Sequence, residues 1–250
     1  MTIEHTMCFF DCNAQIGRYG VRHPEAFTTA DELADEMAHC GISEALVYHS
    51  MAKEYAPAIG NEMLLQEIEG RPIHPCWVVM PHHTGEMPPP DELLAVMKQK
   101  GVRAVRAFPS LHQFRLSDWC AGELLDMLEA VGIPLFLDLD QTSWEDVAGI
   151  LKDHPRLNLV LLRTSYRIDR YVCPLFEKYE NLRIEAATYQ VNYGIEEVCR
   201  RFGARRLLFG TGLPFTEAGS SIAQITYAEI GDADKRLIAV ENLRELLAWA

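Results

Sequence analysis

Polar side chains able to do chemistry stand at or just after the ends of several short apolar segments. They are Asn13, Gln15, His49, His82, Asp138 and Arg163. Histidine exchanges a proton near neutral pH, and a partly desolvated aspartate acts as a general base. An arginine guanidinium is a fixed cation that binds a carboxylate or stabilises an oxyanion, and amides supply donors and acceptors. These residue types favour proton transfer on a small anionic substrate.

Eight short segments, mostly apolar on both faces, have the pattern of buried parallel strands: 7–12, 45–49, 73–80, 102–108, 135–139, 159–162, 182–186 and 206–209. Helical segments alternate with them. A capping box at residues 29–32 begins a helix that ends before Gly41, and the last predicted helix covers residues 234–249. Strand followed by helix, eight times, predicts an α/β fold, a (β/α)8 TIM barrel with one domain over residues 1–250. The alternative, an open doubly wound sheet, usually has fewer strands.

In such a barrel the working residues lie at the carboxyl ends of the strands, so we expect the polar side chains to meet at one mouth. Arg106 lies within the fourth strand and is either a second anion anchor or a structural residue. Glu185, Thr188 and Thr211 lie at the ends of the seventh and eighth strands. With Asn13, Gln15 and Arg106 they form the predicted substrate-binding set.

The composition limits the partners. The chain has 250 residues, 48% of them hydrophobic, and a formal net charge of −13. Nucleic-acid binding needs basic patches, which this acidity argues against. Seven scattered cysteines without a C-x-x-C pair indicate reduced thiols, and neither a signal peptide nor a membrane-spanning run is recognised. We therefore expect a cytoplasmic protein that binds a small molecule, most simply a carboxylate, and neither nucleic acid nor membrane. Homo-oligomerisation is left open.

Six motifs in order resemble the amidohydrolase-related family, the metal-dependent hydrolases and decarboxylases on a TIM barrel. They are residues 10–17 (Phe-Asp-Cys-Asn-Ala-Gln-Ile-Gly), 101–109, 132–138, 154–163, 206–214 and 240–247. The first is similar to the family's Asp-x-His-x-His-x-Gly segment, and residues 206–214 are similar to its Gly-Ser-Asp-x-Pro segment. The resemblance covers nearly the whole chain.

The chain departs from this family at all five metal-site positions. Asn13, Gln15, Asp138 and Arg163 stand where the family has histidines, and Gly212 stands where it has an aspartate. Amide oxygens are poor zinc ligands. A divalent ion about 4 Å from a guanidinium would be repelled by roughly 8 kcal/mol at an effective dielectric constant near 20. We therefore predict no metal at this site and no other cofactor.

The resemblance also implies a replacement for the metal. Arg163 would put a fixed positive charge where the ion was, and Asp138 would either pair with it or act as a general base. A buried Arg–Asp pair that merely fills the mouth is the plainer interpretation. Asp11 either orients the first-strand residues or forms hydrogen bonds lower in the barrel.

The favoured function is a metal-independent hydrolase of lactonase or amide-hydrolase type, or a lyase, acting on a small anionic or sugar-acid substrate. Its catalytic candidates are Asp138, Arg163, His49 and His82. The alternative is an inactive relative that binds a small molecule or a partner chain. A third interpretation is a relocated metal site that combines Asp138 with a histidine. The histidines in question are His49, His82 and His83.

The mouth of the barrel distinguishes an enzyme from an inactive relative. Convergent polar residues around an open pocket favour an enzyme. A mouth plugged by Phe108, Trp144 or Tyr166 would favour the inactive relative.

Overall fold

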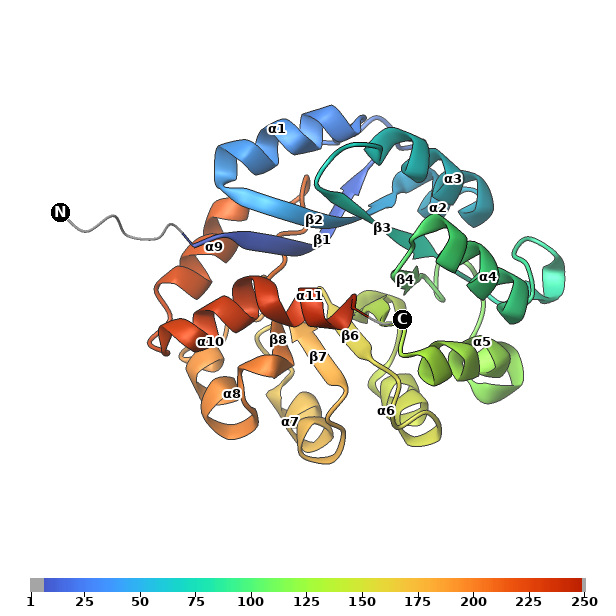
Figure 1. Ribbon diagram of the computed structural model, residues 1–250. Coiled ribbons are helices and arrows are strands. Elements are labelled where there is room, and N and C mark those ends of the chain that lie inside the picture. The colour runs from blue at the N-terminus through green and yellow to red at the C-terminus, as the bar shows by residue number, and fades with distance from the viewer. Residues whose placement is uncertain (1–6, 249–250) are drawn as a thin grey trace.

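Eight parallel strands pair in the order in which they follow one another in the chain. The computed structural model describes residues 7–248, with the helices arranged around this ring of strands (Figure 1). The strands are β1 (Phe9–Ile16), β2 (Ile42–His49), β3 (Ile73–Val78), β4 (Ala104–Ala107), β5 (Leu135–Asp138), β6 (Leu159–Leu162), β7 (Leu182–Glu185) and β8 (Leu207–Leu208). The fold is a single-domain (β/α)8 TIM barrel, which confirms the prediction from the alternating segments.

The ring closes between β1 and the segment that follows β8. The backbone N–H of Cys12 donates to the carbonyl of Phe209 at 3.0 Å, and that of Gly212 donates to the carbonyl of Asn13 at 2.8 Å. The rings of Phe9 and Phe209 pack with their centroids 4.6 Å apart. All residues of β1, β4, β5 and β6 are buried, so the barrel interior is a packed core and not a pore.

The longer helices surround the strands. They are α1 (Ala30–Cys40), α3 (Pro57–Ile68), α4 (Pro90–Lys100), α5 (Asp118–Val131), α6 (Trp144–Asp153), α7 (Asp169–Lys178), α8 (Gly194–Phe202) and α9 (Ala218–Thr226). The predicted capping box forms at α1: the Thr29 hydroxyl accepts from the Glu32 N–H while the Glu32 carboxylate accepts from the Thr29 N–H. The helix ends at Gly41, whose φ of 75° suits glycine.

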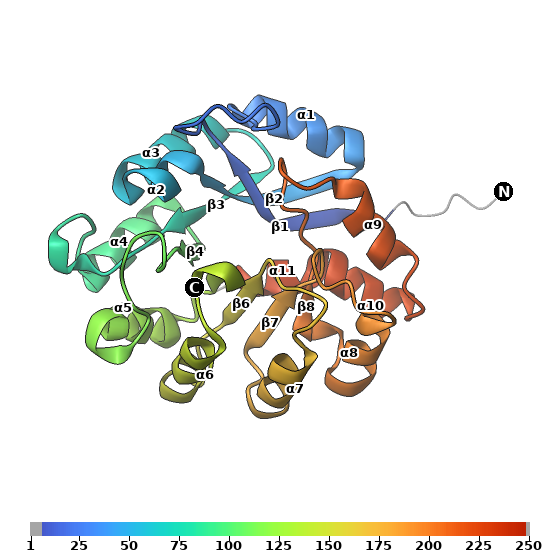
Figure 2. The same cartoon turned by 180° about the vertical axis from the view of Figure 1, so that it is seen from behind.

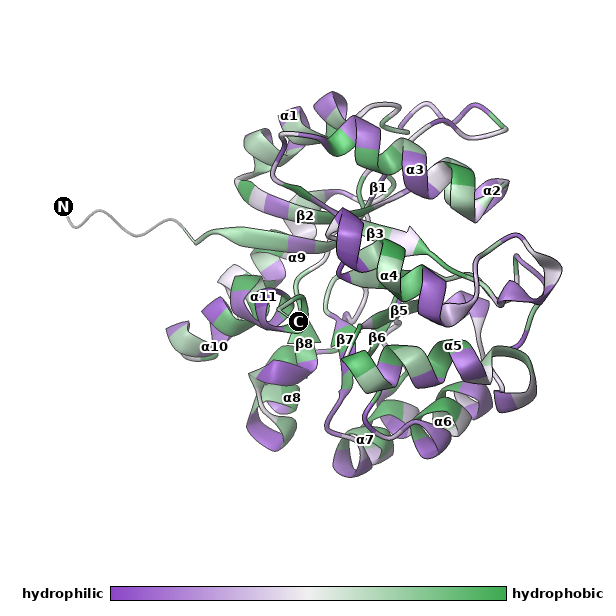
Figure 3. Cartoon of the chain, turned by 45° about the vertical axis from the view of Figure 1, so that its right-hand side comes forward, coloured by the Kyte–Doolittle hydropathy of each residue, from purple (hydrophilic) through white to green (hydrophobic). Residues whose placement is uncertain are grey.

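Hydrophobic residues follow the strands, and hydrophilic residues cover much of the helix surface (Figure 3). This is the pattern expected when amphipathic helices pack against a buried sheet. Within residues 7–248, no helix has both the length and the apolar character needed to cross a bilayer.

The last part of the chain differs from its prediction. One helix is expected over residues 234–249, but the structure has α10 (Asp232–Arg236), a π-helical turn (Leu237–Glu241) and α11 (Asn242–Leu246). Residue 249 lies outside the described residues. The carbonyl of Ile238, within the π-helical turn, accepts from the N–H of Phe209 at 3.0 Å, so this segment also bonds to the end of β8.

Helix α11 lies across the amino ends of the strands (Figure 1). The amide nitrogen of Asn242 donates to the carbonyls of Ala204 at 2.9 Å and Leu207 at 2.8 Å, where β8 begins. The opposite end of the barrel, seen in Figure 2, carries the loops that follow the strands. The candidate site lies at that end.

Strand β1 continues beyond its predicted end at residue 12 to Ile16. The added polar residues Asn13 and Gln15 are buried. A hydropathy pattern ends a strand at such residues, but a barrel interior accepts polar side chains that find hydrogen-bond partners. The other strands begin and end within three residues of their predicted bounds.

Candidate active site

A cavity of about 60 Å³ lies at the carboxyl ends of the strands. Seven of the ten predicted site residues line it: Asn13, Gln15, Arg106, Arg163, Glu185, Thr188 and Thr211. Asp138, His49 and His82 are not in its lining. The sequence therefore identified most of the residues that line this cavity, but several of them make contacts other than those expected.

Arg106, from β4, holds the buried positive charge of the mouth. Its Nη1 donates to Oδ1 of Asn13 at 2.8 Å, and its Nη2 forms an ion pair with Asp138. The guanidinium carbon lies 4.4 Å from the centre of the Tyr48 ring, a cation–π geometry. Burial, the largest single effect, lowers the pKa of Arg106, but Asp138, Tyr48 and Cys76 together raise it by more, so the net shift is upward.

Arg163 does not take the place predicted for it. Its side chain is 53% exposed, and its Nε lies 3.8 Å from Oδ2 of Asp140, not against Asp138. The residue follows β6 with a φ of +52°, so the chain leaves the strand direction there. Arg106 lies inside a strand instead, and its long side chain reaches the mouth from within. The expected Arg163–Asp138 pair is thus replaced by Arg106–Asp138.

Glu185, at the end of β7, is the buried carboxyl group on this cavity. Its Oε1 accepts from Nδ2 of Asn13 at 2.8 Å, and its Oε2 accepts from the backbone N–H of Arg163 at 3.0 Å. Desolvation by burial raises its pKa to about 7, although both hydrogen bonds oppose the shift. Gly210 makes room for it, because a Cβ there would lie 2.4 Å from Oε1 of Glu185. A carboxyl group with this pKa can exchange a proton at neutral pH.

Asp11 joins the two edges of the barrel. Its Oδ1 accepts from the backbone N–H groups of Asn13 and Thr211, each at 2.9 Å, and its Oδ2 accepts from the Thr211 hydroxyl. Burial raises its pKa to about 6. Of the two roles considered for Asp11, these contacts favour orientation of the first strand. They also show that the Thr211 hydroxyl is already engaged.

Two tyrosines that the sequence reasoning missed hold Gln15. The hydroxyls of Tyr19 and Tyr48 both donate to Oε1 of Gln15. Tyr48 immediately precedes His49 at the end of β2, and neighbouring strand residues face opposite sides. Choosing the histidine as the inward residue therefore excluded the tyrosine. The alternation of side chains along β2 could have identified Tyr48, but only if it had been known which residue of the strand faces the barrel interior.

His49 and His82 lie away from the cavity. His49 caps α2 (Ser50–Glu54): its Nδ1 accepts from the N–H of Met51 at 3.0 Å, and its Nε2 lies 3.3 Å from Oε1 of Glu67. Burial lowers its pKa while Glu67 opposes the shift. His82 lies 3.7 Å from Glu123, with its ring beside that of His83. The structure brings neither histidine to Arg106 or Glu185.

The three aromatic residues considered as plugs do not line the cavity. Phe108 is buried with its ring centroid 5.5 Å from that of Tyr48. Trp144 stacks on Tyr171 with centroids 5.2 Å apart, and Tyr166 is exposed. Thr188 does line the cavity, 3.5 Å from the hydroxyl of Thr164.

Lys53 is a further cation that the sequence reasoning missed. Its Nζ lies 5.3 Å from the centre of the Phe108 ring. Burial lowers its pKa, and the nearby Arg106 lowers it further. Lys53 lies on α2, a five-residue helix directly after β2, so only a model of the loop after that strand would have placed it near the mouth.

The donors at this mouth do not fit the divalent ion of the resembled family. Oδ1 of Asn13 accepts from Arg106, Oε1 of Gln15 accepts from two phenols, and Gly212 has no side chain. Within the described part of the chain, no three His, Cys, Asp or Glu side chains are grouped as a metal site requires. Among residues 7–248, this finding also argues against the third interpretation, a metal site that combines Asp138 with a histidine.

The closed ring of eight parallel strands, with its polar mouth, defines an α/β-barrel protein. The family model for amidohydrolases matches residues 14–249, and the chain belongs to this family. No curated protein matches the chain in sequence.

Several solved structures have the same fold. The 5-carboxyvanillate decarboxylase of Sphingomonas paucimobilis has a TM-score of 0.75 and 12% identity, covering 98% of this chain and 100% of its own. A candidate 2-pyrone-4,6-dicarboxylic acid hydrolase of Pseudomonas putida has a TM-score of 0.68 and 16% identity, covering 97% and 98%. A dihydroxybenzoic acid decarboxylase of Polaromonas, with bound manganese and 2-nitroresorcinol, has a TM-score of 0.66 and 13% identity, covering 97% of each chain. At these identities the likeness shows the fold.

Proposed function

We propose that this protein is a hydrolase or lyase that acts on a small carboxylate at the barrel mouth and needs no metal ion. The observation that carries the proposal is the Arg106 guanidinium, held between Asn13 and Asp138 on the cavity that Glu185 also lines. A fixed cation there binds a substrate anion and stabilises its negative charge, as a metal ion does in metal-dependent enzymes. Barrels of this fold that are named as decarboxylases and as a candidate hydrolase of carboxylate compounds support the substrate class.

Arg106 is the anion anchor in this proposal. Two of its N–H groups bind Asn13 and Asp138, while its buried Nε has no partner among the described residues. Asp138 balances the buried charge and fixes the guanidinium plane, whereas the two roles considered for it were pairing with Arg163 and general-base catalysis. A guanidinium that is already oriented binds a carboxylate, or the oxyanion that develops from it, without reorganisation.

Glu185 is the group that moves the proton. Its pKa of about 7 leaves part of it ionised at neutral pH, and its two hydrogen bonds fix the direction of both oxygens. As a base it takes a proton from an attacking water, and in its protonated form it returns that proton to the leaving group. Activity should therefore rise with pH through about 7.

Metal content is the first test, because the Polaromonas decarboxylase of the same fold holds manganese. The protein is purified without chelator, and its zinc, manganese and iron are measured by elemental analysis. We expect less than about a tenth of an equivalent of each. A stoichiometric ion that is needed for turnover would overturn the metal-free proposal.

Turnover is tested on a panel of lactones and small carboxylic acids with wild type, Glu185→Gln and the exposed control Glu217→Gln. We expect Glu185→Gln to lower kcat about 10²–10⁴-fold and to abolish the rise through pH 7, while the control keeps both. Equal profiles for all three proteins would remove Glu185 from the mechanism.

One observation favours the non-catalytic alternative. The cavity of about 60 Å³ is far smaller than ordinary ligand pockets of roughly 300–1,000 Å³. A chain that only binds a small anion would show carboxylate-induced thermal stabilisation without turnover of any panel member.

The seven free cysteines fit a reducing compartment, and we propose that the protein is cytoplasmic.

A further inference from the structure

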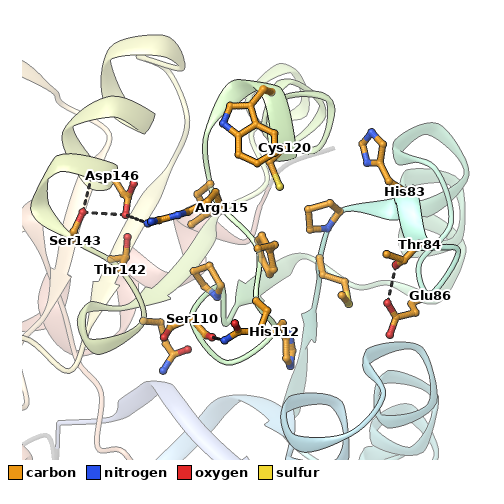
Figure 4. Close-up of a pocket in the computed structure, with 18 of the residues that line it drawn as sticks. His83, Thr84, Glu86, Ser110, His112, Arg115, Cys120, Thr142, Ser143 and Asp146 are labelled. Carbon is orange, nitrogen blue, oxygen red and sulfur yellow. Dashed lines mark hydrogen bonds and ion pairs between the residues drawn. The ribbon is translucent and has the colours of Figure 1, made fainter.

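A second, larger cavity lies beside the barrel mouth, and the proposed chemistry does not use it. Its volume is about 920 Å³, within the range of small-molecule sites. Loops after β3, β4 and β5 form its walls. In Figure 4, Thr142, Ser143 and Asp146 lie on one side of it, with Thr84 and Glu86 opposite.

The lining of this cavity combines apolar surface with short polar groups. Met80, Phe114, Leu116 and Trp119 supply the apolar part. Trp119 is 78% exposed, so most of its indole surface is open to a ligand in this cavity. Such a surface suits a body with an apolar face and a few hydrogen-bonding groups.

Charge on the lining argues against a second anionic group. Three acids, Glu86, Asp140 and Asp146, line the large cavity against one arginine, Arg115. That arginine is already paired, with Nη1 3.6 Å from Oδ2 of Asp146. A carboxylate placed here would meet three acids and a single arginine, and this like charge costs binding free energy.

The two cavities are linked by one ion pair. Arg163 lines the small cavity, Asp140 lines the large one, and their side chains approach to 3.8 Å. Arg106 lines the small cavity, whereas Lys53 lines neither cavity and interacts electrostatically with Arg106, Asp138 and Asp140. Two arginines and one acid, Glu185, line the small cavity, whereas three acids and one arginine line the large one, so the balance of charge is positive at the first and negative at the second.

We infer that the ligand is an elongated monocarboxylate: its carboxylate binds at the small cavity, and an uncharged, partly apolar body occupies the large one against Trp119. This rests on the proposed function for the position of the carboxylate. The inference adds that the body of the ligand has no second negative charge. It also explains how a cavity of about 60 Å³ can bind the carboxylate of a larger molecule.

Three probes separate these contributions: butyrate, 4-phenylbutyrate and 4-(4-carboxyphenyl)butyrate. Their affinities are measured by isothermal titration calorimetry at pH 7.5 with the whole chain. We expect 4-phenylbutyrate to bind at least tenfold more tightly than butyrate, and the dicarboxylate at least tenfold more weakly than 4-phenylbutyrate. Equal affinities for butyrate and 4-phenylbutyrate would overturn the inference.

Two variants assign the effects to the large cavity. Trp119→Ala should reduce the preference for 4-phenylbutyrate over butyrate to less than about threefold, whereas Tyr227→Ala, exposed and outside both cavities, should keep it. Glu86→Lys should remove most of the penalty on the dicarboxylate. An unchanged preference in Trp119→Ala, or an unchanged penalty in Glu86→Lys, contradicts the inference.

The same experiment distinguishes it from the proposed function. If none of the three acids binds, the carboxylate site itself fails, and the inference with it. If the acids bind with the expected preferences but Glu185→Gln has normal turnover, the proposed mechanism fails and the inference stands.

Discussion

The two cavities at the carboxyl ends of the strands are built differently. Five of the eleven residues that line the small one lie in strands, and their polar atoms are held by partners, as Arg106 is by Asn13 and Asp138. The large one is formed mainly by loops, and its Trp119 is largely exposed. Chemistry needs fixed geometry, whereas recognition of a substrate body tolerates adjustable walls. The difference predicts large stability effects for the buried residues of the small cavity, and small ones for its exposed Arg163 and for the residues of the large cavity.

The largest effect is expected for Arg106→Met. It leaves the Asp138 carboxylate buried without its partner, which should lower the free energy of unfolding by about 3–5 kcal/mol. The double variant Arg106→Met/Asp138→Leu should recover most of that loss, because an apolar pair of similar volume often replaces a buried ion pair without cost. Urea denaturation of both proteins checks this. A double variant as unstable as the single one contradicts the pairing.

Glu185→Gln should change the dependence of stability on pH. The wild-type carboxyl has a pKa of about 7 when folded and 4.5 as the reference, so the folded state binds the proton more tightly. The contribution of Glu185 to stability therefore falls as pH rises from about 4.5 to 7 and stays level above. The full span is about 3 kcal/mol, and the variant should lack it. Thermal or urea unfolding at about pH 4 and pH 8 measures it; parallel curves would exclude a buried titrating Glu185.

Gly210→Ala should cost about 1–3 kcal/mol, because the new Cβ would lie 2.4 Å from Oε1 of Glu185 and 3.0 Å from Sγ of Cys12. Gly149→Ala in α6 is the matched control, since nothing lies within 4 Å of its Cβ. That control should gain about 0.5–1 kcal/mol from helix propensity. Similar changes in the two variants would show that Gly210 does not make room for Glu185.

The smallest effect is expected for Arg163→Met. Its ion pair with Asp140 is exposed on both sides, so stability should change by less than about 1 kcal/mol. Stabilisation by butyrate in a thermal shift assay should persist. Loss of that stabilisation in Arg163→Met would move the anion anchor from Arg106 to Arg163.

The sequence predicted the fold because the barrel repeats one simple pattern, apolar strand then amphipathic helix. It also predicted most of the small cavity, since a strand end is readable from hydropathy and the family resemblance supplied the register. Hydropathy located Glu185 at the end of β7, whereas Asn13 and Gln15, beyond the predicted end of the first strand, were identified from the resemblance. The choice between Arg106 and Arg163 could not be read, because it depends on a backbone turn with positive φ after β6.

Partners that come from other parts of the chain were equally unreadable. Lys53 approaches from a short helix, and Tyr19 approaches from the loop after β1. The large cavity is formed by three loops whose spatial relation no local pattern encodes. Hydropathy reports burial along one segment, while these contacts depend on how separate segments meet.

The contact between Asp11 and Thr211 spans 200 residues of chain. Strand β8 has only two residues, so this contact adds to the backbone hydrogen bonds that join β1 to the segment after β8. Closing so long a loop is entropically expensive and slow. β1 leaves the ribosome early, and its edge toward β8 has no partner until almost the whole chain has been synthesised. A partly synthesised chain therefore has an exposed strand edge at β1, which is a site for pairing with other chains.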